Sequence, residues 1–156
     1  SWEPNARIVL HGVSMGAATV LMASGEDLPG NVKAVIADCG YTSEWDEFQR
    51  EADTLHIPWF PVLNATSVLS KVRDGYDFKQ ASALAQVKKS RIPTLFIHGS
   101  SDELVPYSML GELYAAAACE KEELTVEGAG HALSSSVAPT LYWRTVEDFI
   151  AKYLDR

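Results

Sequence analysis

Residues 8–16 read IVLHGVSMG, and the rest of the chain can be interpreted outward from them. The apolar, β-branched start is typical of a buried strand, and the residues that follow, 15–24, are rich in Ala, Leu and Met and predict a helix. G-x-S-x-G between a strand and a helix is typical of a sharp turn that exposes a serine hydroxyl. We expect Gly12 and Gly16 to be required there, because a Cβ at either position would collide with neighbouring backbone. Ser14 is therefore the first candidate functional residue.

The composition is that of an ordinary globular domain with an acidic balance. The 156 residues are 47% hydrophobic and 22% charged, and the formal net charge is −8. A single domain of this length can bury about 70% of the surface of its unfolded chain. An acidic chain without a basic stripe is not expected to bind nucleic acid. No apolar run approaches the roughly 20 residues needed to span a bilayer, so we expect no membrane partner either. The sequence indicates no particular compartment.

Apolar strand patterns alternate with helical patterns along most of the chain. Strands are predicted at residues 6–11, 32–37, 94–98 and 123–127, and helices at residues 15–24, at 106–118 and from Pro139 onward. This alternation predicts the α/β class: a three-layer domain with a parallel sheet of about four strands and flanking helices. Within the last strand, ELTVE alternates in polarity, which favours a position at or near the edge of the sheet.

Residues 41–91 interrupt the alternation. They contain helical patches at residues 43–53, 62–73 and 77–87, with an aromatic and proline-rich segment at 56–61. We interpret them as a helical cap inserted into one domain that spans residues 1–156. The aromatic side chains of the insertion either line a substrate pocket or only attach the cap to the body, and they are Trp45, Phe48, Trp59 and Phe60. Of these, Trp59 and Phe60 are the candidate substrate-binding residues.

Ser14, Asp102 and His131 each follow the carboxyl end of a predicted strand, where sites in parallel sheets lie. A serine hydroxyl becomes a good nucleophile when a base removes its proton, and a carboxylate holds that base in the right tautomer. His131 is the candidate base because its Gly-rich turn can aim the ring back over the sheet. Asp102, on the loop after the preceding strand, is the candidate orienting acid. The Met15 amide, at the start of a helix, is the candidate oxyanion donor.

Other acids and histidines compete with these assignments. Asp38 ends a core strand and stays open as an alternative acid, and Glu103 adjoins Asp102. We expect structural roles for His11 and for His98, which is placed to brace the Asp102 loop. His56 lies in the insertion, where solvation alone accounts for it.

The sequence carries no pattern typical of a metal or cofactor site. The two cysteines, Cys39 and Cys119, end apolar segments and are expected to be small buried side chains. No cluster of His, Cys, Asp or Glu has metal-ligand spacing, and no Gly-rich nucleotide motif occurs. We therefore expect neither a metal nor a cofactor.

Three blocks of the sequence resemble the signature blocks of the α/β-hydrolase superfamily: residues 10–19, 97–106 and 128–131. More narrowly, residues 37–43 and 75–78 are similar to a bacterial group of serine hydrolases, often described as cell-surface hydrolases or as related to dipeptidyl aminopeptidases and acylaminoacyl peptidases. The resemblance spans essentially the whole chain. It implies that Ser14 is the nucleophile, Asp102 the acid and His131 the base of a catalytic triad, with the Met15 amide in the oxyanion hole.

The resemblance covers only the C-terminal part of the family's fold. In complete members several strands precede the strand that carries the nucleophile, and a loop among them supplies a second oxyanion donor. We therefore expect this chain to be a fragment in which residues 8–10 form an exposed sheet edge, which a second copy could cover by forming a homodimer. The loss of one oxyanion donor is expected to cost about a hundred- to a thousandfold in rate.

The expected function is that of a serine hydrolase that cleaves carboxylic ester bonds of a small substrate through an acyl-enzyme, with activity weakened by the absent half of the fold. The aromatic insertion favours an apolar acyl or alcohol group. One alternative is a peptidase or amidase that acts on a small substrate, since amide hydrolysis uses the same groups. The other is a catalytically silent half-fold that acts by association.

Overall fold

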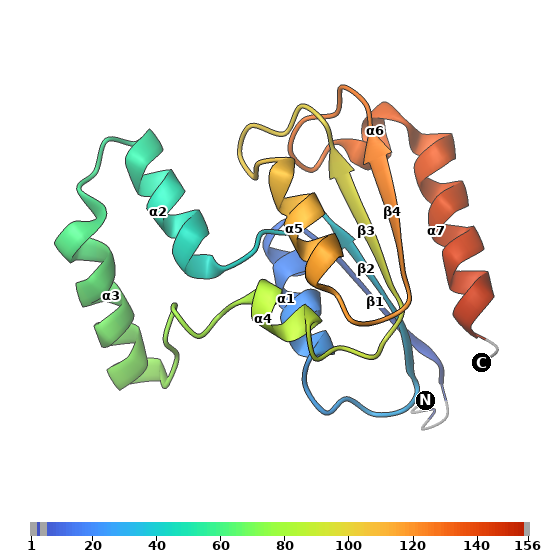
Figure 1. The fold of residues 1–156 in the computed structure, drawn as a ribbon, viewed down its shortest axis with the longest axis horizontal. Helices are drawn as coiled ribbons and strands as arrows, with labels where there is room; N and C mark the ends of the chain where they lie inside the picture. Colours follow the sequence, from blue (N-terminus) through green and yellow to red (C-terminus); the bar gives the residue numbers. More distant parts are fainter. Residues whose placement is uncertain (1–2, 4–5, 155–156) are drawn as a thin grey trace.

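The computed structural model describes residue 3 and residues 6–154, which form an α/β body with a helical arm beside it (Figure 1). The strands are β1 (Ile8–Val13), β2 (Val32–Asp38), β3 (Thr94–Gly99) and β4 (Lys121–Val126). All pair in parallel, in the order β1-β2-β3-β4. The predicted α/β class and four-stranded parallel sheet are confirmed. Within the described residues β1 and β4 are the edge strands, as expected for both.

The register of the sheet brings the ends of the strands to one level. Val13, the last residue of β1, pairs with Asp38, and Asp38 pairs with Ile97 near the end of β3. Every residue of β3 is buried, whereas β1 and β4 are partly exposed. The segments that follow the strands therefore meet along the upper edge of the sheet in Figure 1.

Helices cover both faces of the sheet, because alternate strand residues point to opposite sides. On one face Val35 and Phe96 pack against three helices, α1 (Met15–Ser24), α4 (Ala83–Val87) and α5 (Ser108–Ala116). On the other face Ile36 and Ile97 pack against α7 (Pro139–Leu154). Tyr142, Val146, Phe149 and Tyr153 of α7 are buried against this face, and Ile150 is partly buried there. A short helix that the sequence pattern did not indicate, α6 (Ser134–Val137), precedes α7.

The turn from β1 to α1 has an unusual backbone. Ser14 has φ 56° and ψ −119°, a conformation that L-residues rarely adopt. A Cβ on Gly12 would lie 2.1 Å from the carbonyl oxygen of Gly16, so only glycine fits at Gly12. The same expectation is wrong for Gly16, because a Cβ there would meet no atom within 4 Å apart from its chain neighbours and the nearby backbone of α1 itself. Only the first glycine of the motif is therefore required by packing within this chain.

The helical arm, residues 44–79, contains α2 (Glu44–Thr54) and α3 (Trp59–Asp74). Figure 1 shows both helices beside the body, on the side of α1 and α4. The two connections to the body are joined where Ser43 and Ser82 form an isolated antiparallel bridge. The helix α3 begins earlier than predicted and is kinked at Phe60. The predicted helix at 77–87 is reduced to α4, since residues 75–82 return from the arm to the body. The interpretation of this insertion as a cap stays a prediction.

The longest helices of the described residues, α3 and α7, have 16 residues each. None of the described helices is both long and apolar enough to cross a bilayer.

Candidate active site

Ser14 stands at the end of β1 and caps the start of α1. Its backbone N–H donates to the carbonyl of Asp38 at 2.8 Å, which ties the turn to β2. Its own carbonyl accepts from the amide of Ala18 at 3.0 Å, so the first turn of α1 is formed directly behind the serine. The strained dihedral angles of Ser14 are thus held by backbone hydrogen bonds on both sides.

His131 lies on the loop after β4 and bridges the two other candidate residues. Its Nε2 is 2.8 Å from Ser14 Oγ, and its Nδ1 is 2.9 Å from Asp102 Oδ2. The loop bends sharply around it, with positive φ angles at Gly128 (72°) and Ala132 (57°). Gly99 allows this loop to approach β3, because a Cβ there would lie 2.2 Å from the carbonyl oxygen of Ala129.

Asp102 is held by hydrogen bonds on both carboxylate oxygens, and its side chain is fully buried. Oδ1 accepts from the amides of Leu104 at 3.0 Å and Val105 at 2.9 Å. Oδ2 faces His131 Nδ1 and also lies 3.3 Å from His98 Nε2. His98 Nε2 is 3.0 Å from the Val105 carbonyl, so His98 braces the Asp102 loop as predicted.

The geometry assigns a direction to each hydrogen bond. An ionised Asp102 can only accept, so His131 donates from Nδ1 and keeps the lone pair of Nε2 for the hydroxyl proton of Ser14. This is the arrangement in which a histidine can act as general base toward a serine. The structure thus brings Ser14, Asp102 and His131 together, as the sequence analysis expected.

Met15, the candidate oxyanion donor, is the first residue of α1. Amides in the first turn of a helix have no carbonyl partner within that helix, so they can face an anion. The Met15 side chain is 67% exposed, and the site beside Ser14 is therefore open to solvent on this side.

Asp38, the alternative acid, is placed in a different group of side chains. Its Oδ1 accepts from Ser134 Oγ at 3.1 Å, and Tyr142 is a second hydrogen-bond donor to its carboxyl group. The Tyr142 hydroxyl in turn lies 3.0 Å from His11 Nε2. Burial raises the pKa of Asp38 and lowers that of His11. The carboxylate that pairs with His131 is therefore Asp102, and His11 has the structural environment that was expected.

Cys39, Asp102 and His131 present ligand atoms within 4.8 Å of one another and are of types that bind metals. Burial raises the pKa of Cys39 to about 12. Both oxygens of Asp102 already accept hydrogen bonds, and one of these comes from His131. Asp102 and His131 therefore fit a hydrogen-bonded triad with Ser14, beside the buried Cys39 thiol, better than the three grouped residues fit a metal site.

The candidate substrate-binding aromatics lie elsewhere. Trp59 and Phe60 begin α3 in the helical arm, and their rings are 6.2 Å apart at 78°. Trp59 lines a cavity of about 280 Å³ between α2 and α3, together with Phe48 and Phe78. Phe60 is 66% exposed. The structure does not bring either ring into the group formed by Ser14, Asp102 and His131, and their role toward a substrate stays a prediction.

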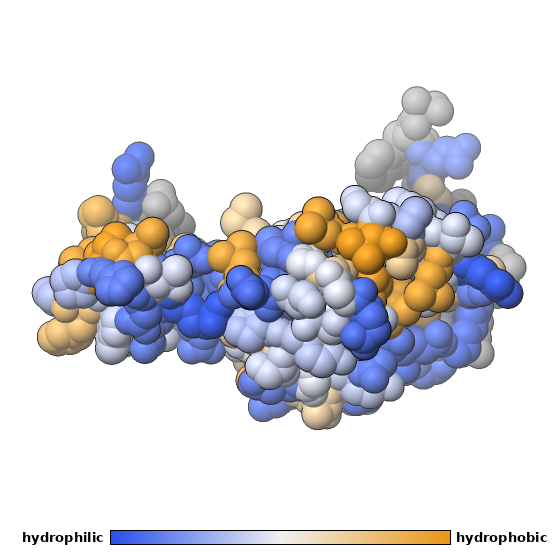
Figure 2. Space-filling model, turned by 90° about the horizontal axis from the view of Figure 1, so that it is seen from above, coloured by the Kyte–Doolittle hydropathy of each residue, from blue (hydrophilic) through white to orange (hydrophobic). Residues whose placement is uncertain are grey.

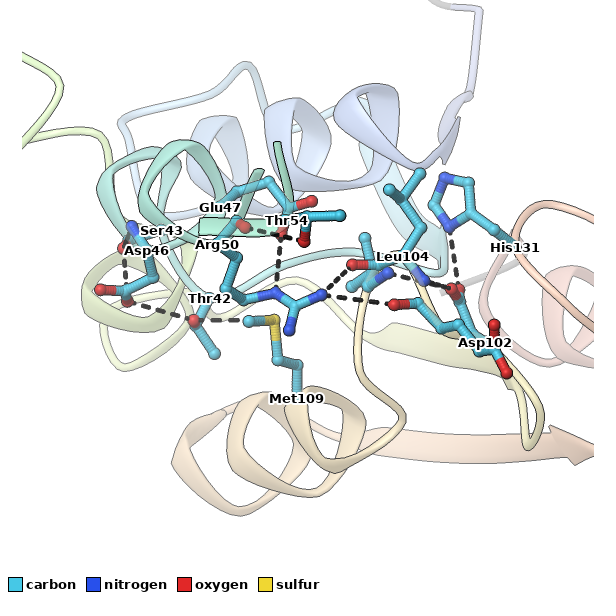
Figure 3. A network of polar contacts seen from close by, with 12 residues as sticks. Thr42, Ser43, Asp46, Glu47, Arg50, Thr54, Asp102, Leu104, Met109 and His131 are labelled. Atoms are coloured by element: carbon cyan, nitrogen blue, oxygen red, sulfur yellow. Dashed lines mark hydrogen bonds and ion pairs between the residues drawn. The ribbon is translucent and has the colours of Figure 1, made fainter. Parts of the chain in front are cut away.

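The arm nevertheless contacts the site through Arg50, which the sequence analysis did not single out. Arg50 Nη2 donates to the carbonyls of Glu103 and Leu104, directly after Asp102 (Figure 3). Glu47, one helical turn earlier, lies 3.8 Å from Arg50 Nε. No local motif signals these contacts, because the partners of Arg50 are backbone atoms more than fifty residues away.

Comparison with known proteins places the chain in a family. The sequence profile described as the prolyl oligopeptidase family matches residues 3–156. The uncharacterised protein YqkD of Bacillus subtilis is 32% identical over 146 residues, which cover 92% of this chain and 47% of that protein. The chain spans only 38–48% of the length of the curated relatives that it matches.

Solved structures show the same fold. An esterase of Pyrococcus furiosus superposes with a TM-score of 0.69 at 20% identity, over 95% of this chain and 55% of that chain. An acylaminoacyl peptidase of Pyrococcus horikoshii superposes with a TM-score of 0.70 at 17% identity, over 97% of this chain and 25% of that chain. The architecture described above is therefore that of an α/β-hydrolase.

Proposed function

Because the chain belongs to the prolyl oligopeptidase family of α/β-hydrolase-like serine hydrolases, we propose that it contributes the catalytic triad of a hydrolase that cleaves carboxylic esters of small substrates. The observation that carries this proposal is the position of His131. One ring nitrogen lies 2.8 Å from Ser14 Oγ and the other 2.9 Å from Asp102 Oδ2. Each group is therefore in reach for the proton transfer that the reaction requires.

In the proposed reaction, the Ser14 hydroxyl gives its proton to His131 Nε2 while Oγ bonds to the carbonyl carbon of the ester. Asp102 stabilises the imidazolium that forms, and the Met15 amide donates to the oxyanion. Collapse of the tetrahedral intermediate breaks the ester C–O bond, and the leaving alcohol takes the proton from His131. Water then attacks the acyl-serine, again with His131 as base, and releases the acid and the free Ser14 hydroxyl.

The exposed groups around Ser14 bear on the substrate. The Met15 side chain and Val13, which is 42% exposed, border the nucleophile with apolar surface. A substrate with an apolar acyl or alcohol group fits this apolar surface better than a charged substrate does. A small peptide or amide is the second candidate, because the family profile and one structural neighbour carry the names of peptidases.

The experiment is the reaction of the purified chain with a fluorophosphonate probe, read by mass spectrometry. We expect labelling on Ser14, no labelling of Ser14→Ala, and labelling of His131→Ala slowed by about a hundred- to ten-thousandfold. Ser136→Ala, at an exposed serine of α6, is the matched control and should be labelled on Ser14 at the unchanged rate. Labelling spread over several serines, or unaffected by His131→Ala, would contradict the proposal.

Assays with p-nitrophenyl acyl esters and with aminoacyl anilides then separate the two substrate classes. Faster turnover of the esters supports the main proposal, and faster turnover of the anilides supports the peptidase alternative.

A silent module that acts by association is the remaining alternative. It is favoured by the open edge of β1, since Ile8 is 39% exposed on a strand with one neighbour among the described residues. Light scattering tests the homodimer that would cover this edge. A dimer in which Ser14 resists the probe would favour association, and a reactive monomer would contradict it.

A further inference from the structure

The contact between Arg50 of α2 and the loop after Asp102 has a particular geometry. Arg50 Nη2 donates to two consecutive carbonyls, those of Glu103 at 3.4 Å and of Leu104 at a shorter distance. Figure 3 shows the guanidinium directed from α2 toward this loop, on the side opposite His131. Arg50 thus reaches from the helical arm to the segment that carries the candidate acid.

The same two peptide groups also hold Asp102. The Glu103 carbonyl and the Leu104 amide are the two ends of one peptide group, and the Leu104 carbonyl and the Val105 amide are the ends of the next. Both amides donate to Asp102 Oδ1, at 3.0 Å and 2.9 Å. Each peptide group is therefore bound at its oxygen by a cation and at its N–H by the carboxylate. Hydrogen bonds in such a chain polarise and strengthen one another.

The Asp102 end of this chain of contacts is shielded from water, whereas the hydrogen bonds that Arg50 makes lie at the surface, with the Arg50 side chain 36% exposed. The Asp102 side chain is fully buried, and Arg50 Nε and Glu47 Oε2 are buried without a hydrogen bond, facing each other at 3.8 Å. Burial raises the pKa of Glu47, and the charge of Arg50 opposes that shift. The titratable or charged groups that surround Asp102 are His98, His131, Cys39, Glu47 and Arg50.

We propose that Arg50 is a positioning residue for Asp102, acting through the peptide groups of residues 103–105 to fix the carboxylate and to balance its charge. The inference rests on the proposed function, because a positioned Asp102 matters only where His131 activates Ser14. It makes the arm part of the site: α2 contributes a cation that touches neither the serine nor the histidine. A movement of α2 away from the body would break both hydrogen bonds of Arg50 to the Asp102 loop.

The proposal differs from a simple tether in its electrostatic consequence. A tether would lose only the attachment of the arm. If Arg50 also balances Asp102, its loss removes a positive charge from the surroundings of His131 and favours the protonated ring. The acidic limb of the pH–rate profile then moves to higher pH. Loss of the negative charge of Glu47 has the opposite effect: it disfavours the protonated ring of His131 and moves the acidic limb to lower pH.

The test uses three variants of the chain, Arg50→Met, Arg50→Lys and Glu47→Gln, with Arg144→Met as the matched control. Arg144 is an exposed arginine of α7 with its own ion pair to Asp148 at 3.8 Å. The rate of fluorophosphonate labelling of Ser14 is measured from acidic to alkaline pH. Hydrogen exchange of the Leu104 and Val105 amides is measured in parallel, because it reports the position of the loop without requiring reactivity.

We expect Arg50→Met to label about ten- to a hundredfold more slowly, with its acidic limb at higher pH and faster exchange at both amides. Arg50→Lys keeps the charge and should recover part of the rate and of the pH profile. Faster amide exchange in Arg50→Met with an unchanged labelling rate and pH profile would overturn the proposal and leave a tether. The same holds if Arg50→Lys behaves as Arg50→Met does.

Failure of the proposed function is distinguishable from failure of this inference. If Ser14 of the unmodified chain does not react with the probe, the proposed function fails, and amide exchange alone decides the role of Arg50. Faster exchange at Leu104 and Val105 in Arg50→Met that Arg50→Lys restores at least in part then supports the positioning of the Asp102 loop, and unchanged exchange, or equal exchange in both variants, overturns it. The melting temperature of each variant shows whether it has folded.

Discussion

The body and the helical arm differ in how they are held together. In the body, β3 is buried along its whole length and α1 buries Ala17, Ala18 and Leu21 completely. In the arm, α2 has no buried side chain, and Leu63 and Ser67 are the only buried ones among the side chains of α3 that the structure describes. Close packing fixes side chains in the body, whereas the arm is ordered mainly by its connections and by surface contacts.

The apolar surface shows the same contrast. The arm exposes large apolar side chains along α3, with Phe60 66%, Leu69 63% and Val72 80% exposed. Figure 2, a view onto the upper edge of the sheet, shows apolar residues on the arm and again on the body. The three candidate catalytic side chains all come from loops of the body, where backbone hydrogen bonds position them. The candidate catalytic side chains therefore lie on the closely packed body, and the arm contacts their surroundings through the hydrogen bonds of Arg50 to the loop after Asp102.

The strongest test of this difference between body and arm replaces one aspartate in each region and compares the labelling rates of Ser14. Asp102→Asn keeps the shape of the side chain but cannot stabilise an imidazolium at His131. We expect the labelling rate at Ser14 to fall about ten-thousandfold, by analogy with serine proteases. Asp77→Asn, in the arm, removes the carboxylate that pairs with Lys71, while the amide oxygen can still accept from Ser67, and it should leave the rate unchanged. A large effect of Asp77→Asn on labelling would show that the arm takes part in the chemistry beyond Arg50.

The sequence predicted the body well because its signals are local and periodic. Apolar runs predicted the first three strands and alternating polarity the fourth, and the positions of Ser14, Asp102 and His131 at strand ends followed from the rule for parallel sheets. The residues brought together by the fold are those that the sequence analysis selected.

The arm was harder to predict, for physical reasons. The sequence pattern predicts that helices form in the arm. The position of α2 and α3 relative to the body depends on few contacts, which the pattern does not indicate. The kink of α3 at Phe60 leaves no periodic signal in the sequence. The role of Arg50 is carried by backbone carbonyls, which every residue has, so sequence alone cannot point to it. For Arg50 the sequence missed a contact that exists, whereas for Gly16 it predicted a steric requirement that the structure does not show.

A second prediction compares one leucine from each region. Leu21 is fully buried in α1, and Leu21→Ala should lower the free energy of unfolding by about 3 kcal/mol, because it removes apolar contacts and leaves a cavity. Leu69 lies on the exposed face of α3, and Leu69→Ala should cost about 0.5 kcal/mol or less. Urea denaturation followed by circular dichroism measures both. If the two variants lose similar stability, the exposed face of α3 is covered in solution, and concentration dependence of the Leu69→Ala effect would identify a second copy as the cover.

The smallest expected effects are opposite responses of the two regions to pH. Burial raises the pKa of Asp38 in the body above the ordinary value of 3.8. Its contribution to stability is therefore fully present below the ordinary value and is lost as the pH rises through the raised pKa. In the arm, the Lys79 amide first and the Lys71 side chain second lower the pKa of Asp77 below 3.8. The contribution of Asp77 is present above the ordinary value and is lost as the pH falls through the lowered pKa.

The two aspartates can be separated by comparing each variant with the unmodified chain from pH 2 to pH 7. Relative to the unmodified chain, Asp38→Asn should become more stable as the pH rises, because asparagine has no charge to bury and can still accept from Ser134. Asp77→Asn should become less stable over the same range, because it lacks the carboxylate that Lys71 and the Lys79 amide stabilise. Differences of the same sign would mean that burial does not separate the two carboxylates. Opposite signs would show that protonation of Asp38 removes a buried charge from the body, whereas protonation of Asp77 weakens its bonds within the arm. On acidification the arm should then unfold before the body.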